Sequence, residues 1–215
     1  MINPIDFLVH FDKYLADFVL AYGNWVYGLL FAIIFAETGF VVTPFLPGDS
    51  LLFAAGALAT GTGSLNPWIL IALLFAAAFA GNAVNYAIGR AVGPKVFAAT
   101  DQASWIHKLL NRQHLDRAHA FFEQRGGMAV VLGRFVPIVR TFVPFVAGAA
   151  RMTPAAFVFY NFVGAAGWVV LCVGAGLLFG QWPFVKNNFS LVTIGIVIVS
   201  VLPVVFEFLK HRRRA

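Results

Sequence analysis

Charged residues are scarce in this chain of 215 residues, since only 11% are Asp, Glu, Lys or Arg. An ordinary soluble domain has about 25% charged residues, which cover its core with a polar shell. Apolar residues make up 60% of the chain, and phenylalanine alone occurs 24 times. The composition therefore excludes a soluble globular protein and a disordered chain, and it indicates an integral membrane protein.

Cysteine is almost absent as well, because Cys172 is the single one and lies in an apolar run. One cysteine cannot form an intrachain disulfide, which excludes a disulfide scaffold. Three histidines lie close together in a polar segment, at positions 107, 114 and 119. A solvated face explains them better than convergent metal ligands, so neither a metal nor a cofactor is expected.

The few charges are mostly positive, with a net charge of +6, and they gather in two clusters. Six lysines and arginines lie from Arg90 to Arg125, and four more lie from Lys210 to Arg214. Nucleic acid could bind such clusters, but in so apolar a chain the positive-inside rule explains them better. Both clusters, and with them the C-terminus, are predicted to be cytoplasmic in a multi-pass protein of the bacterial cytoplasmic membrane, without nucleic acid as a partner.

Long uncharged stretches predict three spanning helices, at 67–90, 154–180 and 188–209. Each contains the roughly 20 mainly apolar residues that a spanning helix needs. Residues 3–20 are predicted to form an interfacial amphipathic helix, because their apolar residues share one side and their charges are too many for a span. Residues 94–126 are predicted to form an amphipathic cytoplasmic loop.

Two further stretches, 22–59 and 127–150, are interrupted before they reach spanning length. The breaks are set by Pro44, Pro47 and Gly48 in the first stretch, and by Pro137 and Pro144 in the second. Proline and glycine disrupt helices, so each stretch is predicted to be a re-entrant hairpin. Non-helical backbone at membrane depth must be buried in protein or line a wet cavity.

The two halves of the chain also share a pattern of prolines and glycines. The spacing is 87 residues for Pro67 and Pro154, Gly89 and Gly176, and Gly93 and Gly180, and 92 residues for Gly56 and Gly148. The pattern predicts one repeat at 22–93 and another at 127–180, with hairpins that enter from opposite faces. The predicted fold is all-α, a single polytopic membrane domain over 1–215 with two opposed re-entrant hairpins in an inverted repeat plus spanning helices.

Four ionisable residues lie inside the predicted hairpins: Glu37 and Asp49 in the first, Arg134 and Arg140 in the second. A charge at the bilayer centre costs at least about 2.5–3.5 kcal/mol on insertion scales, so these groups must be paired or hydrated. They could form salt bridges that only hold the hairpins together. Buried ion pairs are weak stabilisers compared with apolar packing, which favours a functional polar chamber.

The segregation of acids from bases suits an anionic substrate that is coupled to protons. Arg134 and Arg140 are predicted to bind a phosphate, because guanidinium is permanently charged and binds phosphate bidentately. Glu37 and Asp49 are predicted to carry or gate protons, because desolvation and a nearby arginine act on a carboxylate in opposite directions. Candidate chamber-lining residues are Ser50, Asn82, Asn85 and Tyr86, of which the last three could equally form hydrogen bonds between helices.

Three blocks of sequence together resemble the DedA family of bacterial membrane proteins, which is related to SNARE-associated and VTT-domain proteins. They are Glu37-Thr38-Gly39 with Pro44 to Leu52, then Tyr86-x-x-Gly89-Arg90-x-x-Gly93, then Gly133-Arg134-Phe135-x-Pro137-x-x-Arg140. The resemblance covers about residues 25–180. It implies a lipid flippase or scramblase that depends on proton-motive force, with undecaprenyl phosphate among the lipids carried, and it implies importance for the four hairpin charges. Many relatives have aspartate where this chain has Asn82, which leaves the role of a third carboxylate open.

The sequence thus predicts a membrane transporter of a phosphate-bearing lipid, above all undecaprenyl phosphate, in support of the cell envelope. Alternatives are a flippase or scramblase for phosphatidylethanolamine and a proton-coupled ion or drug antiporter. A lipid phosphatase is disfavoured because the hairpins contain no His, Cys or Lys, so no enzyme activity is expected. The expected partners are the lipid substrate, the bilayer and protons, and a homo-oligomer is left open.

Overall fold

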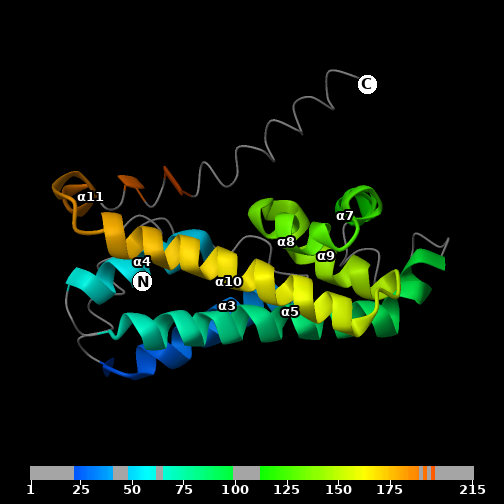
Figure 1. Cartoon of the computed structure of the whole chain (residues 1–215), viewed down its shortest axis with the longest axis horizontal. Helices are drawn as coiled ribbons and strands as arrows, with labels where there is room; N and C mark the ends of the chain where they lie inside the picture. Colours follow the sequence, from blue (N-terminus) through cyan, green and yellow to red (C-terminus); the bar gives the residue numbers. More distant parts are fainter. Residues whose placement is uncertain are drawn as a thin grey trace, which may run out of the picture. The chain divides into compact units, whose positions relative to one another are not determined.

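The computed structural model describes residues 22–40, 48–61, 65–98, 112–188, 191–192 and 195–196, and within these ranges all regular structure is helical (Figure 1). This confirms the predicted all-α class. The predicted helix 3–20, the two prolines Pro44 and Pro47, and most of the predicted helix 188–209 lie outside the described residues. The re-entrant course of the two hairpins stays a prediction.

Two short helices lie in the first predicted hairpin. Helix α3 covers Trp25–Gly39 and helix α4 covers Gly48–Gly61, with 15 and 14 residues respectively. Both are shorter than the roughly 20 residues that a spanning helix needs. Helix α4 begins at Gly48, where the sequence predicts a break, and Asp49 lies in its first turn, where the helix dipole favours a negative charge.

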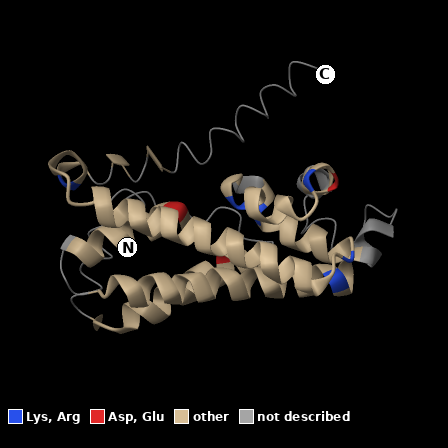
Figure 2. Ribbon diagram, viewed as in Figure 1, with Lys and Arg blue, Asp and Glu red and all other residues tan. Residues whose placement is uncertain are grey.

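Two long apolar helices follow the two hairpins. Helix α5 covers Pro67–Ala98 and helix α10 covers Pro154–Phe179, and Figure 2 shows that both are free of charge along most of their length. Their segments Pro67–Gly93 and Pro154–Phe179 have mean hydropathies of 1.9 and 2.2 and are long enough to cross a membrane. Helix α5 extends past its predicted end at position 90, because a charge ends an apolar stretch without ending a helix.

The second predicted hairpin contains helix α8 at Met128–Leu132, a 3-10 turn at Gly133–Phe135 and helix α9 at Pro137–Ala149. Val136 is extended, with φ −114° and ψ 106°, as expected for a residue before proline. The predicted break at Pro144 is wrong, since Pro144 lies inside α9. The helix tolerates this proline because residues 141–148 around it are all buried in the protein. Their packing outweighs the loss of one helical hydrogen bond.

The described residues form two compact units. Unit 1 contains residues 22–33, 48–61, 65–75 and those from Val169 onward, and unit 2 contains residues 34–40, 76–98 and 112–168. The core of unit 2 includes Phe142, Phe145 and Phe157. Helix α7, Arg112–Arg125, lies in the predicted cytoplasmic loop, and its Phe121 and Phe122 pack against that core.

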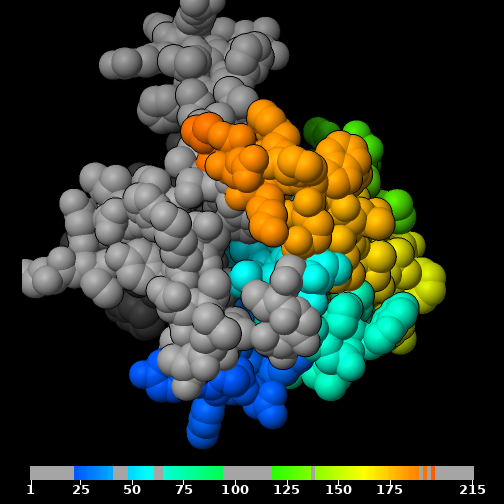
Figure 3. All heavy atoms as spheres, turned by 90° about the vertical axis from the view of Figure 1, so that its left-hand side faces the viewer, coloured from blue at the N-terminus to red at the C-terminus, as the bar shows by residue number. Residues whose placement is uncertain are grey.

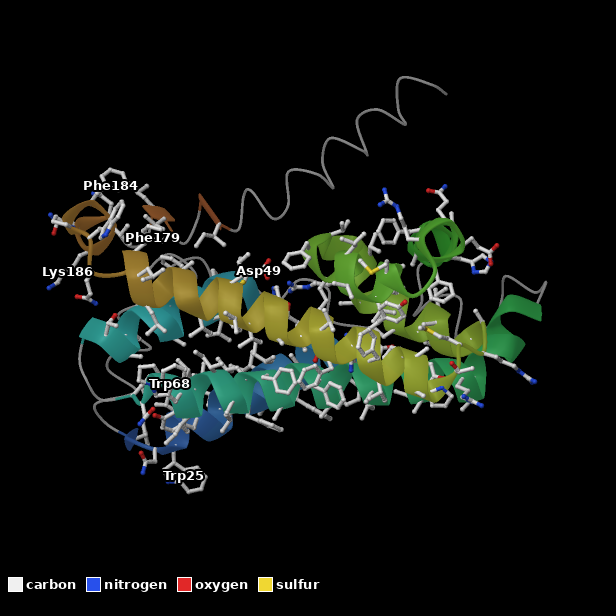
Figure 4. The ribbon with its side chains drawn as sticks, in the orientation of Figure 1. Trp25, Asp49, Trp68, Phe179, Phe184 and Lys186 are labelled. Atoms are coloured by element: carbon white, nitrogen blue, oxygen red, sulfur yellow. The ribbon has the colours of Figure 1, made fainter. Side chains whose placement is uncertain are left out.

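One end of unit 1, where α3 and α5 begin and the short helix α11, Pro183–Asn187, lies, faces the viewer in Figure 3. Large aromatic side chains are exposed at this end. Trp25, Trp68, Trp182 and Phe184 are each more than half exposed. Figure 4 shows Trp25 and Trp68 directed outward, and Lys186 on α11 near Phe184. Tryptophan and lysine favour the membrane–water interface, so this end of unit 1 has the composition of an interfacial belt.

Glycines allow a short helix to pack closely on a long helix in each unit. In unit 1, a Cβ at Gly56 on α4 would overlap the backbone of Val173 on α10, and one at Gly176 would overlap the backbone of Phe53. In unit 2, a Cβ at Gly148 on α9 would overlap the backbone of Tyr86 on α5. Helix contacts through small residues of this kind are common in membrane proteins.

The close contacts of the two units correspond residue by residue. Tyr86 and Val173 are 87 residues apart, which is also the separation of Gly89 and Gly176. A Cβ at Gly89 would overlap the backbone of Phe145, which lies 92 residues after its counterpart Phe53. The same two offsets relate the matching glycines in the sequence. This agreement supports an internal repeat in which the short helix of each half packs on the long helix of the other half.

Replacement of Gly176 with alanine should lower the free energy of unfolding by about 1–3 kcal/mol, the range for overpacked sites. The added methyl group would meet the backbone of Phe53 and Ala57, which can only move with α4. Gly174→Ala is the matched control on the same helix, because a Cβ there has nothing within 4 Å. Unfolding of the purified variants in detergent, followed by circular dichroism, measures the difference, and equal unfolding temperatures would contradict it.

Candidate functional site

A small cavity in unit 2 brings together residues from four stretches of the chain. Its lining residues are Thr38, Asn82, Arg134, Arg140, Thr141 and Trp168. The cavity has a volume of about 10 Å³, which is about the space that one water molecule needs. Three of the predicted site residues, Asn82, Arg134 and Arg140, therefore meet at one place.

The cavity wall depends on a close approach between α3 and α5. A Cβ at Gly81 would overlap the Thr38 hydroxyl, so only glycine lets the two helices meet where Thr38 and Asn82 reach the cavity. One turn later, the buried Asn85 Nδ2 donates hydrogen bonds to the carbonyls of Thr38 at 3.2 Å and Thr141 at 2.7 Å. Asn85 thus links α5 to α3 and α9. Of the two roles that the sequence leaves open for Asn85, this contact is the hydrogen bonding between helices.

Glu37 and Arg140 form an ion pair at this site. Glu37 is completely buried, and the Arg140 side chain is only 10% exposed. Among the described residues, no other donor forms a hydrogen bond to either Glu37 oxygen. The carboxylate therefore depends on one guanidinium for its compensation, and the structure joins the two predicted hairpins through one acid and one base.

Arg134 is buried, and its hydrogen-bond partners among the described residues are neutral. It is 5% exposed, and its Nη2 donates to Asn161 Oδ1 at 2.7 Å and to the Ala78 carbonyl at 3.2 Å. Within the described part of the chain, no acidic group lies within ion-pair distance of Arg134, and its Nε has no hydrogen-bond acceptor. Neutral groups thus accept hydrogen bonds from Arg134 and leave its positive charge uncancelled.

Trp168 lies against both arginines. Its ring centroid is 6.0 Å from Cζ of Arg134 and 5.5 Å from Cζ of Arg140, and the side chain is buried. The face of an indole ring attracts cations at such distances. Trp168 therefore helps to keep two like charges beside the same cavity.

The remaining predicted residues have other surroundings. The Tyr86 hydroxyl donates to the Met152 carbonyl and accepts a hydrogen bond from Arg90 at 3.0 Å. Tyr86 thus links α5 to the connection between α9 and α10, and it is not among the cavity-lining residues. Asp49 and Ser50 belong to unit 1, and their part in the site stays a prediction. The sequence pattern does not single out Thr38, Thr141 or Asn161 as site residues, although Asn161 is the single side-chain amide of α10. Trp168 lies in the middle of a predicted span, which favours packing or cavity lining, and it lines the cavity.

Comparison with known proteins places the chain in a family. The family model described as VTT domain matches residues 46–178. Protein DedA of Escherichia coli K12 is 50% identical over 212 residues, which cover 98% of this chain and 94% of that protein. The chain belongs to the DedA family. No solved structure matches it.

Other relatives of this DedA-family chain are also named as membrane proteins. Inner membrane protein YqjA of Escherichia coli K12 is 36% identical over 181 residues, 84% of this chain and 78% of that protein. An uncharacterized membrane protein of Mycobacterium leprae is 37% identical over 171 residues, with coverages of 80% and 74%. With the two long apolar helices, these names establish that the chain is a membrane protein.

Proposed function

We propose that this DedA-family protein translocates a phosphate-bearing lipid across the cytoplasmic membrane, with undecaprenyl phosphate as the expected substrate. The observation that carries the proposal is the buried Arg134, which has no carboxylate partner among the described residues and lines a cavity together with a second arginine. An uncompensated buried charge is costly to maintain. A phosphate group is the anion whose geometry best matches paired guanidinium groups.

The cavity supplies the other groups that a phosphate needs. Arg140 offers a second guanidinium, and Asn82 adds a side-chain amide to the lining, whose second N–H can donate to a phosphate oxygen. A phosphate is larger than one water molecule, so the surrounding helices must separate before it enters. Hairpins open to opposite faces, with the C-terminus cytoplasmic, would give the site access to each leaflet in turn.

Glu37 is the group that we propose to couple binding to protons. When ionised, it holds Arg140 in an ion pair. Protonation of Glu37 would cancel that attraction and release Arg140 to the phosphate. Asp49 is proposed as a second proton-carrying group, and the proton-motive force would then drive the cycle.

Transport suits this site better than catalysis. The six lining residues include no histidine, cysteine or lysine, and the Thr38 hydroxyl donates to the carbonyl of Ile34 at 2.8 Å. Chemistry on a phosphate would need an activated nucleophile or a base beside it. We therefore propose that the protein is a transporter and not an enzyme.

A leaflet-resolved assay in proteoliposomes tests the proposal. Undecaprenyl phosphate and phosphatidylethanolamine are compared, each with and without a pH gradient, against protein-free vesicles. We expect undecaprenyl phosphate to change leaflets faster with protein than without it, and faster still with the gradient, while phosphatidylethanolamine does not. Equal movement of both lipids would indicate a phospholipid scramblase, and cation-dependent proton flux without lipid movement would indicate an antiporter.

A further inference from the structure

One face of α10 is built around the Arg134 side chain. Asn161, Gly164 and Trp168 follow one another at spacings of three and four residues, so they lie on the same face of the helix. A Cβ at Gly164 would be 3.2 Å from Arg134 Cδ and 3.3 Å from its Nε. Gly164 therefore leaves space for the arginine, between the amide that accepts its hydrogen bond and the indole that covers it.

Asn161 is held in one orientation by three hydrogen bonds. Its Oδ1 accepts from Arg134 at 2.7 Å and from Asn82 Nδ2 at 3.2 Å, while its Nδ2 donates to the Phe79 carbonyl at 3.0 Å. The side chain is completely buried. A side-chain amide has an acceptor oxygen and a donor nitrogen, so the bond from Nδ2 to the Phe79 carbonyl fixes the oxygen toward Arg134.

The neutrality of this amide matters as much as its geometry. An aspartate at position 161 would place a carboxylate oxygen at hydrogen-bond distance from Arg134. In a buried site of low dielectric, the resulting ion pair would be strong. The pair of Arg134 and the aspartate would then have no net charge with which to attract an anion. Asn161 instead holds the guanidinium by a hydrogen bond and leaves its positive charge uncancelled.

We infer that Asn161 is a positioning residue that orients Arg134 toward the cavity and must be neutral for Arg134 to bind an anionic headgroup. The inference rests on the proposed function, because it assigns how the phosphate-binding arginine is held. Asn161 lies on α10 and is outside the predicted set of site residues. A neutral Asn161 holds Arg134 by a hydrogen bond, whereas an aspartate at position 161 would cancel the charge of Arg134.

Asn161→Asp is the direct test, with Asn66→Asp as the matched control. Asn66 Oδ1 accepts from the backbone of Trp68 at 3.0 Å at the start of α5, and aspartate caps helices equally well. In the proteoliposome assay with undecaprenyl phosphate, we expect Asn161→Asp to raise KM at least about tenfold, the scale of one lost charge-assisted hydrogen bond. Asn161→Asp also removes the N–H that donates to the Phe79 carbonyl, so its unfolding temperature is measured beside KM to show that the variant is folded. Asn66→Asp should change neither value.

A second pair of variants covers a failure of Asn161→Asp to fold. Gly164→Ala should raise KM because its methyl group displaces the Arg134 side chain, whereas Gly167→Ala, where a Cβ has nothing within 4 Å, should not. An unchanged KM in Asn161→Asp would overturn the inference, as would equal increases in Asn161→Asp and Asn66→Asp. If Asn161→Asp does not fold, equal KM values for the two glycine variants overturn it.

Binding separates the inference from the proposed function. Undecaprenyl phosphate added in detergent should raise the unfolding temperature of the wild type and not that of Asn161→Asp. If the wild type is stabilised but moves no lipid, the proposed transport fails and the inference stands on the difference between the two proteins. If the wild type moves lipid and Asn161→Asp does so with the same KM, the inference fails alone. A wild type that neither binds nor moves the lipid overturns both.

Discussion

Glu37→Ala should lower the free energy of unfolding by about 3–5 kcal/mol, the cost typical of removing one partner of a buried ion pair. Glu37 is completely buried and has Arg140 as its partner. The variant would leave the Arg140 guanidinium beside the cavity without its carboxylate. The destabilisation should therefore come mainly from the lost ion pair and not from the lost packing.

A double-mutant cycle checks this origin. Glu37→Leu combined with Arg140→Met replaces the pair with apolar groups of similar size, and it should recover most of the stability that either single variant loses. Glu123→Ala is the control, because Glu123 contacts His119 in an exposed pair at 4.0 Å, which is worth about 0–1 kcal/mol. A coupling energy below about 1 kcal/mol between positions 37 and 140, measured by unfolding in detergent, would contradict the prediction.

The same double variant separates two interpretations of the hairpin charges. If the ion pair only holds the hairpins together, the stable apolar pair should still transport lipid. If Arg140 binds phosphate and Glu37 responds to protons, the double variant should be stable and inactive. The sequence alone leaves both interpretations open, because it does not show which acid lies beside which base in the fold.

Charges in the hairpins are easy to find in the sequence, since a charge inside an apolar stretch is costly and rare. For that reason Glu37, Arg134 and Arg140 are identified without a structure. Their pairing depends on how distant segments pack, so the sequence does not reveal that Arg140 is compensated by Glu37 while Arg134 has no carboxylate partner among the described residues. The two arginines look equivalent in the sequence and have different surroundings in the fold.

Two other features depend on tertiary contacts for similar reasons. Pro144 has the local chemistry of a helix break, but buried packing of the surrounding face carries α9 through it. Asn161 looks like any single amide in an apolar helix, and its importance appears only with its partners on α5 and the 3-10 turn. Helix class and helix starts, by contrast, follow from local signals such as the prolines that begin α5 and α10.

Arg134→Met should reduce translocation of undecaprenyl phosphate at least about a hundredfold, which corresponds to the loss of two charge-assisted hydrogen bonds to the phosphate. Arg134→Lys keeps the charge but not the planar fork that binds phosphate bidentately. This variant should therefore retain an intermediate rate. Arg125→Met is the control, because Arg125 is exposed at the end of α7 and should have no effect on translocation.

Stability should respond to the Arg134 variants in the opposite sense to transport. Methionine replaces a buried charge that no described carboxylate compensates, and such replacements by apolar residues of similar size are often neutral or stabilising. Arg134→Met should thus unfold at or above the wild-type temperature, whereas Glu37→Ala unfolds well below it. A loss of transport that merely follows a loss of folded protein would contradict a binding role. If Arg134→Met is stable and inactive, the buried charge of Arg134 serves to bind the anion and does not stabilise the fold.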